Sequence, residues 1–314
     1  MTKVNLSRRE VLRYGGLLAG TALTGLIWQP GPSVASNLGN GIPGPIAHDA
    51  SGLITVQLFY YRSFIPHQHF MEYSVDVAGD MVAVGGGVVG TEDPGALIYS
   101  SHPNDDLSSW MIGTKDHLIP DSHFVSGYAI GMKIQGMSKK DLVESMLVTT
   151  TTSEKLAHPT VMASLPGDYA LLGGGLRVDW DGSGNLATAS YPVGVSAWEA
   201  RSKDHGDPDP SNLTVFAIGI KRQLPVGVLG TTVAQNKSGV SPIPISTATL
   251  PPGYALCGGG GFVDWHGQGS LLWRLQPDIQ STGQSFIAAS KEHGGFADSE
   301  AITAYAIGAY ITPA

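Results

Sequence analysis

The residues best suited to chemistry in this 314-residue sequence form a triplet of lysine, acid and histidine that occurs three times. The copies are Lys115-Asp116-His117, Lys203-Asp204-His205 and Lys291-Glu292-His293, and consecutive copies are 88 residues apart in both intervals. Ammonium and imidazole donors beside a carboxylate acceptor suit the hydroxyl groups of a sugar or an acidic group on a ligand. The triplets are therefore candidate ligand-binding residues.

Strand alternation indicates how a triplet points. In the stretch that follows Trp198, the side chains of Ser202 and Asp204 share the face of the tryptophan, whereas Lys203 and His205 face the other way. One interpretation is a polar strand end, in which the acid caps turn amides and the lysine and histidine are solvated. The other is a ligand site present three times. A variant of the second brings His117, His205 and His293 onto a pseudo-threefold axis as a metal site, which requires a closed ring of units.

A loop with alternating oxygen ligands is the second candidate. Asp179, Asp181 and Ser183 alternate along it, with a glycine at the sixth position, which resembles the start of a calcium loop, although Ser190 stands where such loops have glutamate. The loop also carries Trp180, and the corresponding loop of the next copy carries Trp265. Such a ring either stacks on a sugar face or folds back onto the core.

Three further features bear on whether the sequence contains a metal site or a nucleophile. His67-Gln68-His69 places two imidazoles on one face of an extended strand, a metal pair without a third ligand in view. The single cysteine, Cys257, takes the place of Leu172 in its copy and is interpreted as a buried apolar residue. A nucleophile elbow of the form Gly-x-Ser-x-Gly is absent from the sequence. We therefore predict no catalytic residue.

The elements that must position these residues recur with them. A triple glycine precedes each triplet, at Gly85–Gly87, Gly173–Gly175 and Gly258–Gly260, and each copy ends in an aromatic-Ala-Ile-Gly stretch such as Tyr128–Gly131. Short runs rich in Val, Ile, Thr and aromatics connect these motifs. The sequence thus predicts an all-β fold of three tandem pseudo-repeats of about 88 residues, arranged with pseudo-threefold symmetry as a β-prism-like body or as three small β-sandwiches.

Glycine weakens a strand, so a repeated triplet of glycines needs a structural reason, such as a bulge, a bend or the close approach of another backbone. The first copy, Gly85-x-Gly87-x-x-Gly90, also matches a dinucleotide-binding fingerprint. The sixth position is Val178 in the second copy and Val263 in the third, and no helical pattern follows. We interpret the glycines as structural.

The N-terminus resembles a twin-arginine export signal of bacteria, carried by the stretch Ser7–Arg13, with Val11 in place of the usual phenylalanine. An apolar, glycine-rich stretch too short to span a bilayer and the small residues Ser33-Val34-Ala35 follow it. We therefore assign residues 1–35 to a signal peptide and residues 36–52 to a flexible lead-in. The three β repeats are predicted at 53–135, 142–223 and 226–312, with a connector at 136–141.

The order of Gly-Gly-Gly, Ser-x-Pro, Trp and Tyr-Ala-Ile-Gly resembles a small β unit found in many secreted bacterial proteins. Ser101-His102-Pro103 and Ser190-Tyr191-Pro192 carry the middle element, and Gln276-Pro277-Asp278 is a looser third copy. The resemblance covers most of the chain after the signal. It implies a β fold and an exported, periplasmic or extracellular protein.

The net charge of the chain and the repetition of its motifs limit the classes of function that we expect. The chain has a formal charge of −8, and removal of the four basic residues and one acidic residue of the signal makes it −11, which disfavours nucleic acid as a partner. No stretch of the mature chain is expected to span a membrane. Three copies of one site favour avidity, so we expect a multivalent, lectin-like protein that binds a glycan or cell-surface polymer. A structural or surface-interaction protein is the second expectation, and a polysaccharide hydrolase or lyase the third. Calcium is the one cofactor that the sequence suggests.

Overall fold

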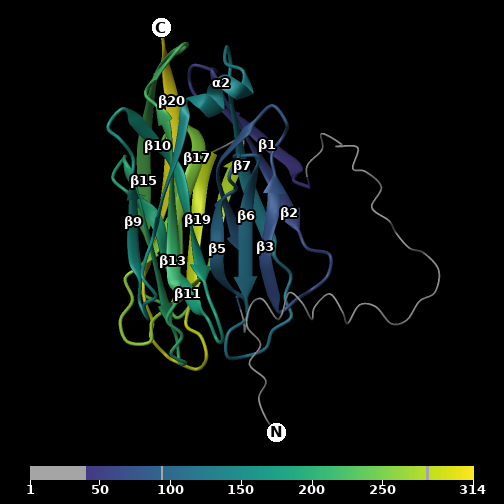
Figure 1. Ribbon diagram of the computed structural model, residues 1–314, viewed down its shortest axis with the longest axis vertical. Coiled ribbons are helices and arrows are strands. Elements are labelled where there is room, and N and C mark those ends of the chain that lie inside the picture. Colours follow the sequence, from purple (N-terminus) through teal and green to yellow (C-terminus); the bar gives the residue numbers. More distant parts are fainter. Residues whose placement is uncertain (1–39, 93–94, 281–282) are drawn as a thin grey trace, which may run out of the picture.

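The computed structural model describes residues 40–92, 95–280 and 283–314, and the predicted signal peptide lies outside this range (Figure 1). The described chain is built almost entirely of antiparallel strands, with one helix of six residues, α2 (Lys139–Glu144). The predicted all-β fold is therefore confirmed. No helix of the described residues is long and apolar enough to cross a membrane.

The strands form three sheets. The first runs in the order β1 (Ile42–His48), β2 (Ile54–Arg62), β7 (Ser126–Ile134), β4 (Val82–Val89), β18 (Leu271–Gln280), β19 (Gly283–Lys291), β16 (Ile245–Thr249). The second runs β3 (His69–Asp76), β6 (Ser109–Lys115), β5 (Leu97–Pro103), β10 (Tyr169–Asp179), β13 (Asn212–Lys221), β8 (Met146–Thr152). The third runs β14 (Gln223–Leu224), β15 (Gly227–Lys237), β20 (Ile302–Pro313), β17 (Ala255–Val263), β11 (Asn185–Val193), β12 (Ala197–Asp204), β9 (Thr160–Ser164).

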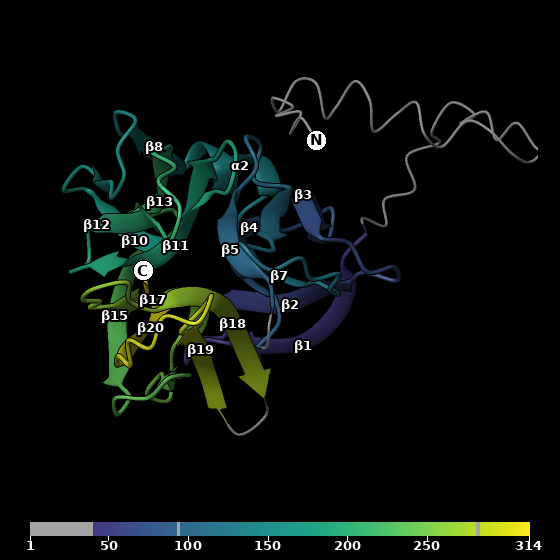
Figure 2. The same ribbon diagram turned by 90° about the horizontal axis from the view of Figure 1, so that it is seen from below.

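Strands of corresponding sequence occupy the same place in each sheet. The glycine strands β4, β10 and β17 each pair on one side with the strand that closes their own copy. On the other side each pairs with a strand of a different copy, β18, β5 and β11 respectively. Every sheet is thus shared by two copies, and the sheets surround a common interior (Figure 2). This arrangement differs from three separate sandwiches, in which each copy would keep its strands together.

The triple glycines lie where backbones of different copies meet. A Cβ atom at Gly85 would lie 2.2 Å from the carbonyl oxygen of Cys257, and one at Gly173 would lie 2.2 Å from that of Val84. A Cβ at Gly258 would lie 2.6 Å from the carbonyl oxygen of Leu172. The first glycine of each copy therefore touches the main chain of another copy, and the three contacts close a ring. The predicted close approach of another backbone is the reason for these glycines.

The second glycine of each triplet makes room for the aromatic residue that precedes the Lys-acid-His motif. A Cβ at Gly174 would lie 2.3 Å from the ring of Trp198, and Gly86 and Gly259 stand in the same relation to Trp110 and Phe286. These three aromatic residues are fully buried. The indole N–H of Trp198 donates to the hydroxyl of Ser190 at 2.9 Å, and Trp110 donates likewise to Ser101. The serine of the Ser-x-Pro element thus satisfies a buried donor.

One local prediction was wrong, and a connector contains a helix that the sequence pattern did not indicate. Strand β1 lies within the segment 36–52 that was predicted to be a flexible lead-in, and it pairs with β2 from Ile42 to His48. The helix α2 begins within the predicted connector 136–141. Ser138 caps it by accepting from the Asp141 N–H, and the Asp141 side chain reaches back to the Ser138 N–H. This reciprocal cap, rather than an apolar stripe, favours so short a helix.

Candidate functional site

The three Lys-acid-His triplets lie at the ends of β6, β12 and β19, at the end of the molecule opposite α2 (Figure 1). The lysine and histidine side chains were expected to be solvated in one interpretation, and this is wrong. Lys115, Lys203 and Lys291 are 1 or 2% exposed, and the three histidines are 1 to 4% exposed. Alternation sends them away from the tryptophan, but the loops of a neighbouring copy cover that face as well.

The three histidines meet where the copies converge at this end of the molecule. The Nε2 atom of His117 lies 2.6 Å from the carbonyl oxygen of His205, and Nε2 of His205 lies 2.8 Å from that of His293. Nε2 of His293 in turn contacts the carbonyl oxygen of His117. The ring centroids are 5.6 to 6.0 Å apart. The sequence hypothesis of a common axis is therefore matched by the geometry, and the three residues bind one another in a closed cycle.

This cycle does not have the geometry of a three-histidine metal site. Each Nε2 atom points at a main-chain carbonyl oxygen, whereas metal ligation needs ring nitrogens with free lone pairs directed at one point. In the described part of the chain, no group of three or more His, Cys, Asp and Glu side chains is placed to hold a metal ion. The histidine cycle joins the copies to one another.

The other ring nitrogen and the lysine of each triplet reach into the loop of the next copy. Nδ1 of His117 lies 2.8 Å from the carbonyl oxygen of Ser183, which also accepts a hydrogen bond from Lys115. Lys291 donates to the carbonyl oxygens of Thr91 and Glu92, both at 2.9 Å. Each triplet is thus a clasp between two copies, made by its histidine and, in the first and third triplets, by a buried ammonium that donates to the carbonyls of a tight loop.

The two tryptophans of these loops lie against the lysines. The ammonium of Lys115 lies 4.6 Å from the ring centre of Trp180, and that of Lys203 lies 4.1 Å from the ring centre of Trp265. Both indoles are half-buried, and their second neighbour is a histidine, His69 or His158. The rings are therefore neither fully exposed nor folded into the core, and cation–π contacts hold them against the lysines.

The acid is the outermost member of each triplet. Asp204 pairs with Nε2 of His158 at 2.8 Å, and Asp116 pairs with Nε2 of His69 at 2.7 Å. Glu292 accepts instead from the hydroxyl of Ser299. His69, which the sequence offered with His67 as a candidate metal pair without a third ligand, is thus engaged by Asp116. The main chain of His67 pairs with that of His123.

Burial controls the charges at this end of the molecule. It lowers the pKa of Lys115 and of Lys203 to about 8, against the opposing effect of the neighbouring carboxylates. It also lowers the pKa of His117 and of His205, and that of His293 to about 4. Hydrogen bonds to carbonyl oxygens oppose these histidine shifts but are the smaller effect. At neutral pH the histidine cycle is accordingly uncharged, and each neutral ring carries one N–H, with which it donates to only one of the carbonyl oxygens that it faces.

The predicted calcium loop uses its oxygens within the protein. The Asp179 carboxylate lies 3.3 Å from Nε of Arg177, and the Ser183 hydroxyl donates to Asp207 at 2.9 Å. The carbonyl of Ser183 accepts the Lys115 ammonium. A lysine of the neighbouring copy therefore binds the main chain of this loop.

Sequence reasoning missed a fourth recurring group, an aspartate four or five residues after each triplet histidine. Asp209 accepts from the Gly184 N–H at 2.5 Å, and Asp298 accepts from the Gln268 and Gly269 N–H groups at 2.5 and 3.0 Å. Asp121 accepts from the Gly95 N–H at 3.0 Å. Each carboxylate caps the loop that the lysine of the neighbouring copy binds. The near-constant spacing from the histidine was the signal that could have revealed it.

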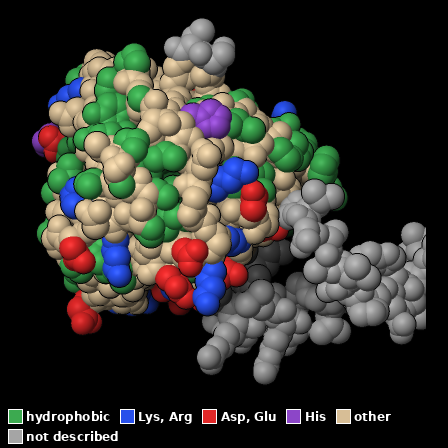
Figure 3. All heavy atoms as spheres, turned by 90° about the horizontal axis from the view of Figure 1, so that it is seen from above, with side chains coloured by type: hydrophobic (Ala, Val, Ile, Leu, Met, Phe, Trp, Pro, Cys, Tyr) green, Lys and Arg blue, Asp and Glu red, His purple; other side chains and the backbone are tan. Residues whose placement is uncertain are grey.

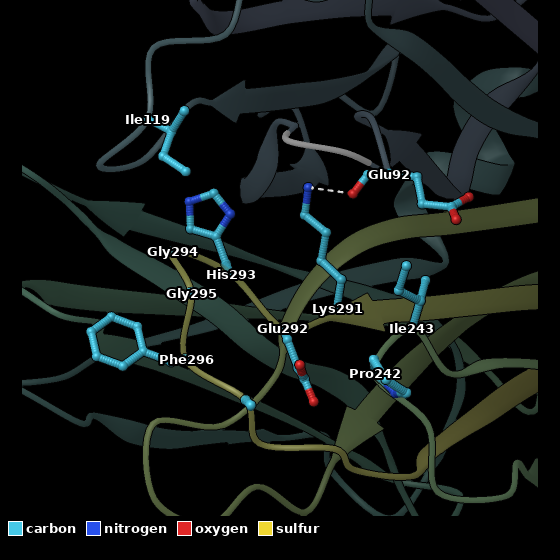
Figure 4. Close-up of a pocket in the computed structure, with 11 residues that line it drawn as sticks. Glu92, Ile119, Pro242, Ile243, Lys291, Glu292, His293, Gly294, Gly295 and Phe296 are labelled. Carbon is cyan, nitrogen blue, oxygen red and sulfur yellow. Dashed lines mark hydrogen bonds between the residues drawn. The ribbon is translucent and has the colours of Figure 1, made fainter.

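Two of the junctions between copies contain pockets. One, of about 370 Å³, is lined by Lys291, Glu292, His293, Phe296 and Ile119, among others (Figure 4). In it Lys291 extends toward the main chain of Glu92, while the Glu292 side chain points away from Lys291 (Figure 4). The other pocket, of about 250 Å³, is lined at the corresponding place by Lys203 and Asp204, together with His158, Asp207 and Gln268.

At the opposite end of the molecule, a hollow of about 440 Å³ is lined by Asp80, Lys133 and residues that lead into α2, and among the described residues it contains no histidine or aromatic side chain. Seen from above, hydrophobic side chains there are interspersed with polar atoms and with small groups of charged side chains (Figure 3). The junction pockets, with acid and imidazole groups beside apolar walls, are therefore the better candidate for a ligand site. No family model matches the chain, and no curated protein sequence matches it either.

Proposed function

We propose that the protein is an exported, multivalent carbohydrate-binding protein whose junction pockets hold sugar residues. The observation that supports this proposal is that two pockets lie at corresponding junctions and that each is lined by a lysine and an acid of a triplet. Two equivalent sites on one chain favour avidity for a repeating polymer.

The chemistry of the pockets fits a polyhydroxylated ligand. Asp204, Asp207 and His158 supply acceptor and donor groups in one pocket, and Phe296, Ile119 and Ile243 supply apolar surface beside Glu292 in the other. A sugar offers hydroxyl groups that both donate and accept, and C–H faces that pack on apolar side chains. The lysines contribute less, because both are buried, and Lys291 donates to main-chain carbonyls while Lys203 lies against the ring of Trp265.

Export is part of the proposal and rests on the sequence. The stretch Ser7–Arg13 resembles a twin-arginine signal, and such export would place the protein in the periplasm or outside the cell. Cell-wall or extracellular polysaccharides are the carbohydrates met there. Secretion of the full chain, and its loss in an Arg8→Lys, Arg9→Lys variant, would test this part.

A structural or surface-interaction protein is the second candidate. It is favoured by the clasps, since the burial of the lysines and histidines gives the triplets a role in folding that needs no ligand. Binding data distinguish the two candidates, because only the first requires the acids that line the pockets.

The test is binding to a panel of oligosaccharides and polysaccharides by the mature chain and by an Asp204→Asn, Glu292→Gln variant. Loss of charged acceptors should weaken binding about tenfold or more. The matched control is Asp80→Asn, because Asp80 is an exposed acid at the other end of the molecule, paired with Lys133. Failure of the mature chain to bind any member of the panel would overturn the proposal.

A further inference from the structure

A second surface lies on the outer face of the third sheet. Strand register places one residue from each of six adjacent strands in a row across this face. Met162 pairs with Glu199, Glu199 with Tyr191, and Tyr305 with both Gly260 and Gln235. Ser190 pairs with Gly261, which places Tyr191 next to Gly260. The row is therefore Met162, Glu199, Tyr191, Gly260, Tyr305, Gln235.

Gly260 allows the two tyrosine rings of the row to meet. It lies on the strand between them and carries no side chain. A Cβ atom at this position would lie 1.9 Å from the carbonyl oxygen of Ser190. The ring centroids of Tyr191 and Tyr305 are 5.3 Å apart, and that of Phe262 is 5.0 Å from Tyr191. All three rings are half-buried. We call this group, with Glu199 and Arg201, the aromatic platform.

Polar groups border the aromatic platform on one side. Glu199 accepts from the Tyr191 hydroxyl at 2.7 Å and pairs with Arg201 at 2.7 Å. The Arg201 guanidinium in turn lies 5.0 Å from the ring centre of Phe262. The glutamate and arginine neutralise each other, so the platform carries no net charge in a chain of charge −8. Its surface is complementary to a neutral ligand.

The corresponding rows of the other two sheets are built differently. In the second sheet, His102 lies parallel to Phe216, with centroids 4.5 Å apart, across Gly175. In the first sheet Gln276 takes the place of the second ring, beside Tyr128. In the third sheet, by contrast, Tyr191 contacts the rings of both Phe262 and Tyr305. The platform is thus an elaboration of one face and not a requirement of the fold.

We propose that the aromatic platform binds a neutral polysaccharide chain, whose pyranose rings stack on Tyr191, Phe262 and Tyr305. The C–H face of a pyranose packs on an aromatic ring, and the equatorial hydroxyls at its edge meet Glu199 and Arg201, which offer acceptor and donor groups. This inference rests on the proposed function and deepens it. The junction pockets hold single sugar residues, and the platform holds the extended polymer.

The test uses retention on two insoluble polysaccharides, microcrystalline cellulose and chitin, by the mature chain and by a Tyr191→Ala, Tyr305→Ala variant. The variant is expected to lose affinity at least about tenfold for the polysaccharide that retains the unaltered chain. A Tyr128→Ala variant is the matched control, because Tyr128 holds the position of Tyr305 in the first sheet, and it should be retained like the unaltered chain.

Hydroxyl-radical footprinting of the unaltered chain keeps the test independent of variant stability. A soluble form of the retained polysaccharide should protect Tyr191, Phe262 and Tyr305 from oxidation, and unchanged oxidation would overturn the inference. If the platform variant binds normally while Asp204→Asn, Glu292→Gln does not, the platform inference fails and the proposed function stands. Retention by neither polysaccharide, together with binding to no soluble glycan, would overturn both.

Discussion

The Nε2 atom of His117 lies 2.6 Å from the carbonyl oxygen of His205, the residue that stands 88 positions later at the same place in the next copy. Repeated around the centre, this contact lets each copy hold its neighbour through the same residue type. A polar motif that recurs at constant spacing can thus serve the assembly of the fold, while its outermost member, the acid, remains at the edge of a pocket.

Replacement of His205 by alanine should destabilise the protein. The change removes a buried side chain whose neutral ring contacts the carbonyl oxygens of His293 and Gln268 and donates to one of them. The cavity and the acceptor left without its donor together cost about 2–4 kcal/mol in the free energy of unfolding. Urea denaturation measures this loss. The control is His158→Ala, whose side chain is half exposed and should change stability by less than about 1 kcal/mol. Equal stability of the two variants would contradict the clasp.

Acid should weaken the histidine cycle before the carboxylates are titrated. Burial lowers the pKa of His293 to about 4 in the folded chain, against about 6.5 in the unfolded chain. As the pH falls, the unfolded state therefore binds protons first. The contribution of His293 is complete above about pH 6.5 and is lost as the pH falls toward 4.

Between pH 7 and pH 5 this linkage lowers the free energy of unfolding by about 2 kcal/mol for His293. A His293→Gln variant should lack this part of the pH dependence, even if it is less stable at every pH. Chemical denaturation at a series of pH values checks the prediction. Parallel pH curves for the two proteins would mean that His293 does not titrate as described.

The strand-rich fold, the order of the motifs and the role of the glycines could be predicted from the sequence, because period-two alternation and glycine sterics act locally, whereas strand β1 and helix α2 could not. The burial of Lys203 and His205 was not predictable in this way. Alternation along the strand predicts that these side chains point away from the face that carries the tryptophan. The loop that covers the opposite face comes from residues more than 60 positions away, such as Gln268. The aromatic platform could not be predicted for the same reason, because Tyr191 and Tyr305 are brought together only by the pairing of their strands with β17.

A methyl group at Gly173 should not be tolerated. Its Cβ would lie 2.2 Å from the carbonyl oxygen of Val84, a main-chain atom that cannot move aside without shifting a shared sheet, so Gly173→Ala should cost about 3 kcal/mol or prevent folding. Gly79→Ala is the control, because a Cβ at Gly79 meets nothing within 4 Å. Thermal melting of both variants measures the difference in stability. A Gly173→Ala protein as stable as the control would show that the copies do not meet as described.

The most direct measurement of the central claim is the stoichiometry of oligosaccharide binding by titration calorimetry. If the junction pockets are independent sugar sites, Asp204→Asn removes one site per chain, and addition of Glu292→Gln removes a second, while the unfolding transition is retained. A stoichiometry that is unchanged in both variants would contradict the assignment of carbohydrate binding to the junctions between copies.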